Sequence, residues 1–261
     1  MAFITDNCIE DNENKFCSLW TTFQRIGDCA NLFFNDTLRG DYFFNRLNNL
    51  RFYEVEDALG KALEICSKNK HDLYVHIPYT SDNYPLISLL LERGFRSIDS
   101  MYVLKIANNL DISNDHVRPS LRLNIQVQHE SELWVRVFCD AFSVPTWVDE
   151  VDKIIKRNKS NLALIIAHIP EKPSSPVGCM LLYQFHNITG LYCLGTLKPF
   201  RRKGIATRMI RFAAAFERLM DSEYLIVHSL ANENTVNIYR NLGFEIVQVK
   251  AIFALKPLEL K

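Results

Sequence analysis

The order of strand and helix patterns in the second half of the chain restricts its fold more than any other feature. Period-2 alternation and short apolar runs predict strands at 121–128, 162–169, 177–185, 190–197, 224–230 and 244–255. Period-3.6 stripes predict helices around 132–142 and 148–156, from 204 onward, and at 232–243. This order predicts an α/β (α+β) domain built on a mixed sheet.

The first half contains fewer predicted elements, and its end repeats the end of the second half. The predicted elements are helices around 15–29, 55–68 and 85–94, and strands at 72–77 and 95–106. Asn83 and Gly94-Phe95 recur 149 residues later as Asn232 and Gly243-Phe244. The shared spacing predicts an internal duplication with an incomplete first copy. Chance, or the ordinary use of Asn and Gly as helix caps, is the alternative.

A polar stretch separates the two halves. Residues 107–120 are rich in Asn and Asp and contain a proline near their end, which is typical of a linker or a long loop. We therefore expect three segments: an N-terminal domain at 1–106, a linker at 107–120 and a second domain at 121–261.

Composition excludes several classes of function. Thirty cations balance thirty anions, so attraction of the whole protein to nucleic acid or membrane is not indicated. Seven cysteines without a CxxC pair argue against a disulfide framework or a zinc site, and we expect no metal. The sequence shows no signal peptide and no apolar run of about 20 residues, so we expect a cytoplasmic protein.

The stretch "LKPFRRKGIATRMIRF" places six cations between Lys198 and Arg211, around Gly204. It follows a predicted strand and opens a predicted helix, whose first N–H groups lack intrahelical partners. The glycine lets a ligand approach the backbone closely, and the helix dipole adds partial positive charge. This arrangement predicts a site for a phosphate or pyrophosphate. A solvated basic helix start or a nucleic-acid patch is the alternative.

Two motifs in this half resemble those of a known enzyme family. Arg201-x-x-Gly204-x-Ala206 is similar to the Arg/Gln-x-x-Gly-x-Gly/Ala motif of the GNAT family of N-acetyltransferases. Downstream, Asn232 is followed seven residues later by Tyr239 and then by Gly-Phe, which resembles the family's second signature. The resemblance covers about 121–255. It implies the GNAT acyl-CoA N-acyltransferase fold, and the duplication then implies a degenerate GNAT-like first half.

The resemblance also implies a donor and the residues that bind it. The donor would be acetyl-CoA, and Tyr239 would protonate the leaving thiolate, unless it is a half-buried core tyrosine. Asn232 would bond the pantetheine arm or cap the next helix. The implied donor-binding residues, from the strand, the basic loop and the start of the later helix, are Gly195, Thr196, Leu197, Arg201, Arg202, Lys203, Gly204, Ile205, Ala206 and Asn232.

The acceptor side departs from the family pattern. Many relatives carry a Glu on the strand before the phosphate loop, but "TGLYCLGTL" contains no acid, so the general base is unassigned. His228 is a candidate base or a structural strand residue. Asp149, Glu150 and Asp152 form either an acceptor-binding group or a solvated helix face. Cys193 reads as a small strand residue.

The expected function is therefore transfer of an acetyl group from acetyl-CoA to a primary amine by direct attack in a ternary complex. The acceptor would be a small molecule or a protein amine. The first half lacks the basic glycine loop and has Leu90 where the second has Tyr239. It would shape the acceptor cleft or act as an interaction module. A non-catalytic acyl-CoA-binding sensor or regulatory protein is the alternative function.

Overall fold

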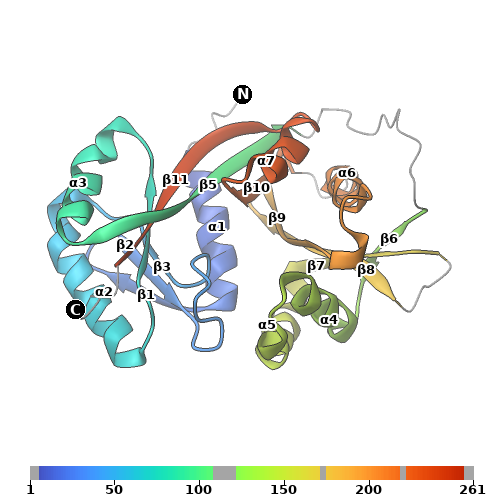
Figure 1. The fold of residues 1–261 in the computed structure, drawn as a ribbon, viewed down its shortest axis with the longest axis horizontal. Helices are drawn as coiled ribbons and strands as arrows, with labels where there is room; N and C mark the ends of the chain where they lie inside the picture. Colours follow the sequence, from blue (N-terminus) through green and yellow to red (C-terminus); the bar gives the residue numbers. More distant parts are fainter. Residues whose placement is uncertain (1–5, 108–121, 171–174, 218–221, 256–261) are drawn as a thin grey trace. The chain divides into compact units, whose positions relative to one another are not determined.

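The computed structural model describes residues 6–107, 122–170, 175–217 and 222–255 (Figure 1). The helices are α1 (Asp6–Trp20), α2 (Val55–Asn69), α3 (Tyr84–Glu92), α4 (Ser131–Phe142), α5 (Val148–Arg157), α6 (Ile205–Glu217) and α7 (Glu233–Arg240). The strands are β1 (Thr22–Ile26), β2 (Ala30–Phe34), β3 (Arg46–Asn48), β4 (Tyr74–Pro78), β5 (Phe95–Ala107), β6 (Asn124–Gln128), β7 (Leu162–His168), β8 (Pro176–Phe185), β9 (Ile188–Thr196), β10 (Tyr224–Leu230) and β11 (Glu245–Leu255). The predicted mixed α/β fold is confirmed.

The chain divides into two compact units that do not follow the order of the sequence. Unit 1 comprises Met1–Phe16, Leu104–His228 and Asn237–Glu245, and unit 2 comprises Cys17–Val103, Ser229–Val236 and Ile246–Lys261. The polar stretch at 107–120 lies almost wholly outside the described residues, so the linker and the segment boundaries stay a prediction. Each unit nevertheless takes in segments from both ends of the chain.

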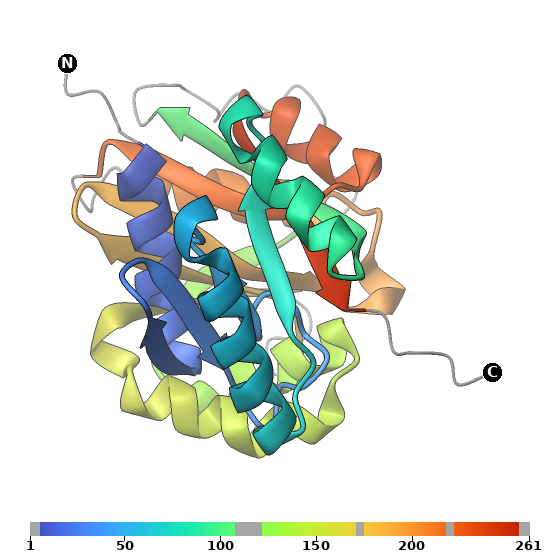
Figure 2. The ribbon, with the colours of Figure 1, turned by 90° about the vertical axis from the view of Figure 1, so that its left-hand side faces the viewer.

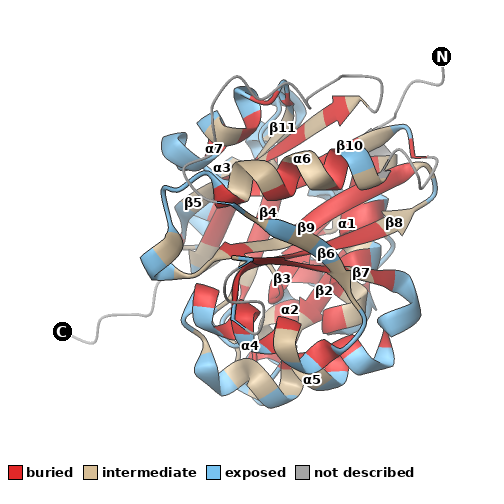
Figure 3. Ribbon diagram, turned by 90° about the vertical axis from the view of Figure 1, so that its right-hand side faces the viewer, coloured by how far each residue is buried: buried red, intermediate tan, exposed pale blue. Residues whose placement is uncertain are grey.

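Unit 1 is built on the strand order β10-β9-β8-β7-β6, in which β9 and β10 are parallel and the other neighbours antiparallel. Its helices cover both faces. A Cβ placed on Gly178 would meet Met209 and Ile205 of α6, whereas one on Gly195 would meet Ala141 of α4. Figure 3 shows the buried inner side of α6 against the strands. The sheet is thus enclosed between α6 and α4.

Unit 2 contains the order β1-β2-β3-β4-β11, in which β3 and β4 are parallel and β4 pairs antiparallel with β11. Its apolar core lies on one face of these strands, where α2 and α3 pack (Figure 2). Ala58 and Ala62 of α2, Leu90 of α3, and Val75 of β4 are among its buried members. Strand β11, from the second half of the sequence, therefore pairs with β4 from the first half.

The predicted duplication recurs in three elements. Adding 149 to the bounds of α3 gives 233–241, against 233–240 for α7. The same shift moves β5 to 244–256, against 245–255 for β11, and β4 to 223–227, against 224–230 for β10. Gly94 and Gly243 both have left-handed backbones, with φ of 88° and 90°. The structure thus supports a repeat at the predicted spacing.

The prediction of a helix around 15–29 is wrong. Helix α1 ends at Trp20, and Thr22–Ile26 forms a strand that pairs antiparallel with β2. Thr22 and Phe23 are residue types that favour strands, and the left-handed Gly27 (φ 60°) begins the turn. The short strands β1, β2 and β3 were not predicted.

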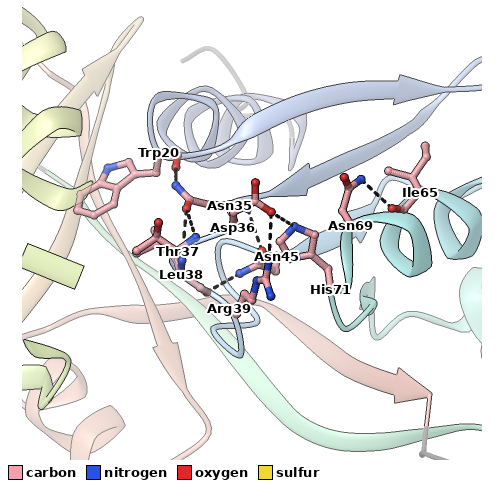
Figure 4. Close-up of polar contacts among 10 residues, drawn as sticks. All are labelled: Trp20, Asn35, Asp36, Thr37, Leu38, Arg39, Asn45, Ile65, Asn69 and His71. Atoms are coloured by element: carbon pink, nitrogen blue, oxygen red, sulfur yellow. Dashed lines mark hydrogen bonds and ion pairs between the residues drawn. The ribbon is translucent and has the colours of Figure 1, made fainter. Parts of the chain in front are cut away.

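Asn35 and Asp36 open the loop between β2 and β3 (Figure 4). The Asn35 amide donates to the Trp20 carbonyl (2.7 Å), and its side-chain oxygen accepts the Thr37 N–H (2.9 Å). The Asn45 side chain accepts the Asn35 N–H and donates to the Leu38 carbonyl. The two asparagines thus satisfy backbone groups that the loop would otherwise bury without partners.

Trp134 gives a test of the packing in unit 1. It is fully buried on α4, and its indole N–H donates to the Met180 carbonyl of β8 at 2.8 Å. We expect Trp134→Phe to lower the free energy of unfolding by about 2–3 kcal/mol, since it removes this donor and leaves a void. Urea unfolding measures the loss. The half-buried Trp147 provides the control, because Trp147→Phe should cost about 1 kcal/mol or less. Equal losses would contradict this account.

Candidate functional site

The basic stretch forms the loop between β9 and α6. Lys198–Phe200 makes a single 3-10 turn, and α6 begins at Ile205. Residues 201–204 are exposed, and Arg202 and Gly204 have positive φ angles of 61° and 76°. Left-handed residues in such a turn form the backbone concavities that bind anions through successive N–H groups.

The start of α6 adds donors to this loop. The N–H of Arg208 donates to the Gly204 carbonyl at 3.1 Å. Residues 205–207 precede Arg208, the first residue whose N–H donates within the helix. Their own N–H groups therefore have no acceptor inside the helix. A Cβ placed on Gly204 would meet no heavy atom within 4 Å. The loop and the helix start therefore present an open site that favours a negative charge.

The side chains of the loop have separate roles. Arg201 donates from Nε to the Thr196 carbonyl (3.0 Å) and from Nη2 to the Ala141 carbonyl (2.8 Å). It thereby ties the loop to β9 and α4. Lys203 Nζ lies 5.3 Å from the centre of the Phe200 ring. Direct contact of Arg201, Arg202 or Lys203 with a bound anion stays a prediction.

A bulge interrupts β9 before this loop. The register between β8 and β9 shifts between the pairs Cys179–Gly195 and Leu181–Tyr192. Within the shift, Cys193 has a positive φ of 55°, which a side chain other than glycine rarely adopts. Bulges of this kind bend a strand and are frequent beside functional sites.

Beyond the bulge, β9 has an open edge. The parallel ladder with β10 runs from Ile188–Tyr224 to Leu191–Val227, and in the described part of the chain it goes no further. Strand β9 itself continues to Thr196. The last residues of β9, 194–196, thus lie beyond the ladder with β10, and an extended ligand can pair with a strand edge of this kind.

Gly195 and Leu197, two of the predicted donor-binding residues, lie near the end of this edge. A Cβ on Gly195 would lie 2.9 Å from both Ala141 and Phe142, so only glycine fits beneath α4. The Leu197 N–H donates to the Val177 carbonyl (2.9 Å) and fixes the end of the strand against β8. The motif residues from 195 to 206 are therefore brought together as one continuous edge and loop.

Asn232 and Tyr239 lie at opposite ends of α7. The Asn232 side-chain oxygen accepts the N–H groups of Asn234 (3.0 Å) and Thr235 (3.4 Å), which is the capping role considered from the sequence. Its contact with a ligand stays a prediction. Tyr239 is 5% exposed and lies edge-on to Phe244. Burial raises the pKa of its hydroxyl far above the ordinary value, so the group stays protonated.

The predicted acidic group on α5 has a partly structural role. Asp152 accepts hydrogen bonds from Ser131 Oγ and Lys156 Nζ, each at 2.7 Å. The bond from Lys156 is the main reason that the pKa of Asp152 is lowered. Asp149 is exposed. These contacts tie α5 to α4 and favour the helix-face interpretation. In the described ranges, no cluster of three potential metal ligands occurs.

Sequence reasoning missed a polar cluster that α1 brings to β9 and β10. The Asn12 amide donates to the Ile188 carbonyl (3.0 Å), and the Tyr192 hydroxyl donates to Asn12 Oδ1 (2.8 Å). Glu13 Oε2 lies 3.2 Å from His228 Nε2. A signal did exist, because Asn12 and Glu13 interrupt the apolar stripe of α1 that includes Ile9, Phe16 and Trp20.

Comparisons with known proteins agree with this geometry. Residues 163–246 match the family described as "Acetyltransferase (GNAT) domain". A 60-residue stretch is 37% identical to N-alpha-acetyltransferase 50 of Danio rerio, covering 22% of this chain and 35% of that protein. The chain thus spans about a third of the length of that curated relative. None of the described helices is both long and apolar enough for a membrane crossing.

Solved structures extend the likeness of fold beyond the matched region. A GCN5-related N-acetyltransferase from Kribbella flavida superposes with a TM-score of 0.71 at 14% identity, over 97% of this chain and 96% of that one. A tandem GNAT protein from the clavulanic acid biosynthesis pathway superposes with a TM-score of 0.58 at 9% identity, over 82% and 76%. The chain therefore shares the fold of GNAT proteins, and its residues 163–246 match the GNAT acetyltransferase domain model.

Proposed function

We propose that the protein is an N-acetyltransferase that moves an acetyl group from acetyl-CoA to a primary amine. The observation that carries the proposal is the loop at 201–206, with its two left-handed residues and its open helix start. This loop continues directly from the open edge of β9. A pyrophosphate and an extended arm are the two parts of coenzyme A that such a site accommodates.

The donor lies along the loop and the strand. The N–H groups of residues 202–206 bind the pyrophosphate, and the side chains of Arg202 and Lys203 add positive charge. The pantetheine arm pairs with the backbone of residues 195–197 as an added strand would. Asn232 caps the first turn of α7 through its side-chain oxygen, which leaves its NH2 group to donate to the arm. The proposed reaction requires no metal.

The reaction is a direct attack in a ternary complex. The amine nitrogen forms a bond to the thioester carbon, the carbon–sulfur bond breaks, and Tyr239 donates its proton to the leaving thiolate. Burial makes Tyr239 a weaker acid. A thiolate released beside Tyr239 would be desolvated as well, which raises the pKa of its thiol in the same direction.

The acceptor is a small amine, an amino acid, or an amine on a protein. The match to N-alpha-acetyltransferase 50 is compatible with a protein N-terminus, but it covers little of that relative. The segment 1–106 acts as a degenerate GNAT-like half that shapes the acceptor side, while 121–261 carries the donor site. All seven cysteines are reduced thiols, which agrees with a cytoplasmic location.

A non-catalytic acyl-CoA sensor is the second candidate. It is favoured by the strand before the phosphate loop, which contains no acid in this sequence. The sensor and the enzyme bind the same donor, and they differ in whether bound acetyl-CoA is consumed. Coenzyme A binding is therefore expected of both, whereas turnover of acetyl-CoA is expected of the enzyme alone.

Gly204→Glu should abolish binding of coenzyme A, because a carboxylate at this position would repel the pyrophosphate. Gly40→Glu is the matched control, since Gly40 also has a left-handed backbone (φ 79°) and a Cβ added there would meet no heavy atom within 4 Å. Both substitutions should cost a similar free energy of unfolding, about 1 kcal/mol. Titration calorimetry with coenzyme A measures binding. Undiminished affinity in a folded Gly204→Glu protein would refute the site.

Tyr239→Phe should lower the turnover of acetyl-CoA by about 10²-fold or more where chemistry limits the rate, because it removes the proton donor. The donor affinity should stay the same, since little volume changes. Tyr183→Phe, at another buried tyrosine of unit 1, is the control and should keep full turnover. If the parent binds acetyl-CoA but never consumes it with a panel of amines, the sensor function replaces the enzyme.

A further inference from the structure

Glu13 and His228 form a buried acid–histidine pair inside the unit that holds the GNAT domain. Glu13 Oε2 lies 3.2 Å from His228 Nε2, and their side chains are 0% and 3% exposed. Removing ionisable groups from water is costly, and a buried pair adds less stability than well-packed apolar residues of the same size. Such pairs are therefore candidates for functional groups when they adjoin a site.

The pair lies where the two parallel strands part. The last residues in the ladder between β9 and β10 are Leu191 and Val227. The next residue on β9 is Tyr192, and the next on β10 is His228. The bulge at Cys193 follows at once. A donor arm that runs from the loop along β9 toward Tyr192 brings its acyl end to this point.

Helix α1 holds the histidine ring in place from two sides. The Tyr192 ring lies parallel to the His228 ring, with 5.9 Å between centroids and 10° between planes. The Phe16 ring of α1 stacks on the Tyr192 ring, with 3.7 Å between their centroids, and Asn12 Oδ1 accepts a hydrogen bond from the Tyr192 hydroxyl. Glu13 is the neighbour of Asn12 in the sequence. One short stretch of α1 thus fixes both the stacking partner and the acid partner of His228.

We propose that His228 accepts the proton of the attacking amine and that Glu13 is the positioning residue that holds its ring. This role rests on the proposed acetyltransferase function. Nε2 is the ring nitrogen that faces the Glu13 carboxylate, at 3.2 Å, so in the proposed neutral form Nε2 carries the proton and Nδ1 the lone pair. The proposed base thus comes from β10 and its positioning residue from α1, whereas β9, residues 188–196, contains no acid.

The proton balance closes without a further reactant. As the amine nitrogen bonds to the thioester carbon, it loses one proton to His228 Nδ1. The carbon–sulfur bond breaks, and the thiolate receives a proton from Tyr239. Return of the proton from the imidazolium to the tyrosinate through water restores both groups. The net products are the amide and free coenzyme A.

The test uses the full chain with His228→Gln, Glu13→Gln and the double variant. Acetyl-CoA consumption is measured with a thiol reagent against a panel of primary amines and in water alone. We expect His228→Gln to lose about 10²-fold or more of kcat, with coenzyme A affinity unchanged by calorimetry. Glu13→Gln should lose less. The double variant should equal His228→Gln, because Glu13 acts through His228.

Stability separates a catalytic pair from a structural one. His228→Gln leaves the Glu13 carboxylate without its histidine, so the midpoint of urea unfolding should fall. It should recover in the double variant, where two amides face each other, while turnover stays low. His168→Gln is the matched control, since His168 is buried on β7 of the same unit, and it should keep its turnover.

Four results would overturn the proposal. If turnover recovers together with stability in the double variant, Glu13 and His228 have a structural role and not a catalytic one. Full turnover in a folded His228→Gln protein would exclude His228 as the base. Additive losses in the double variant would remove the positioning role of Glu13. A parent that binds coenzyme A but consumes no acetyl-CoA would refute the acetyltransferase function itself, and with it this role.

Discussion

The bulge in β9 is the constraint on which the arrangement of the site depends. The left-handed backbone at Cys193 turns β9 away from β10, so that two parallel strands that pair as far as Leu191 separate beyond it. On the β8 side, the register resumes at Gly195, where α4 approaches too closely for any side chain. The open strand edge lies beyond this distortion, the anion-binding loop continues from that edge, and the proposed base lies on the strand that parts from β9.

Most of the second half was predictable from sequence because its signals are local. Strong apolar runs, Pro199 and the glycines set the strand and helix ends within a few residues, and the motif around Gly204 fixes its own backbone conformation. The first half was harder. Strands β1, β2 and β3 are short and gain their stability from pairing, and the Thr and Phe residues after Trp20 were read as a continuing helix.

The polar cluster of α1 was not predictable for a different reason. Its bonds join residues that are 176 and 180 positions apart, as in Asn12 with Ile188 and with Tyr192. Periodicity reports which face of a helix is buried, but not which strand covers it. Two polar residues on a buried stripe therefore indicate that hydrogen-bonding partners exist, but they do not identify those partners. Only the folded chain identifies the partners on β9 and β10.

The pairing of β4 with β11 gives the molecule an unusual order of assembly. Residues 74–78 find their partners at 250–254, so unit 2 stays one strand short while most of the chain is being synthesised. Contacts of such long sequence separation slow folding, and an unpaired strand edge invites association with other chains. During synthesis the β4 edge therefore stays without its β11 partner until residues 250–254 have been made.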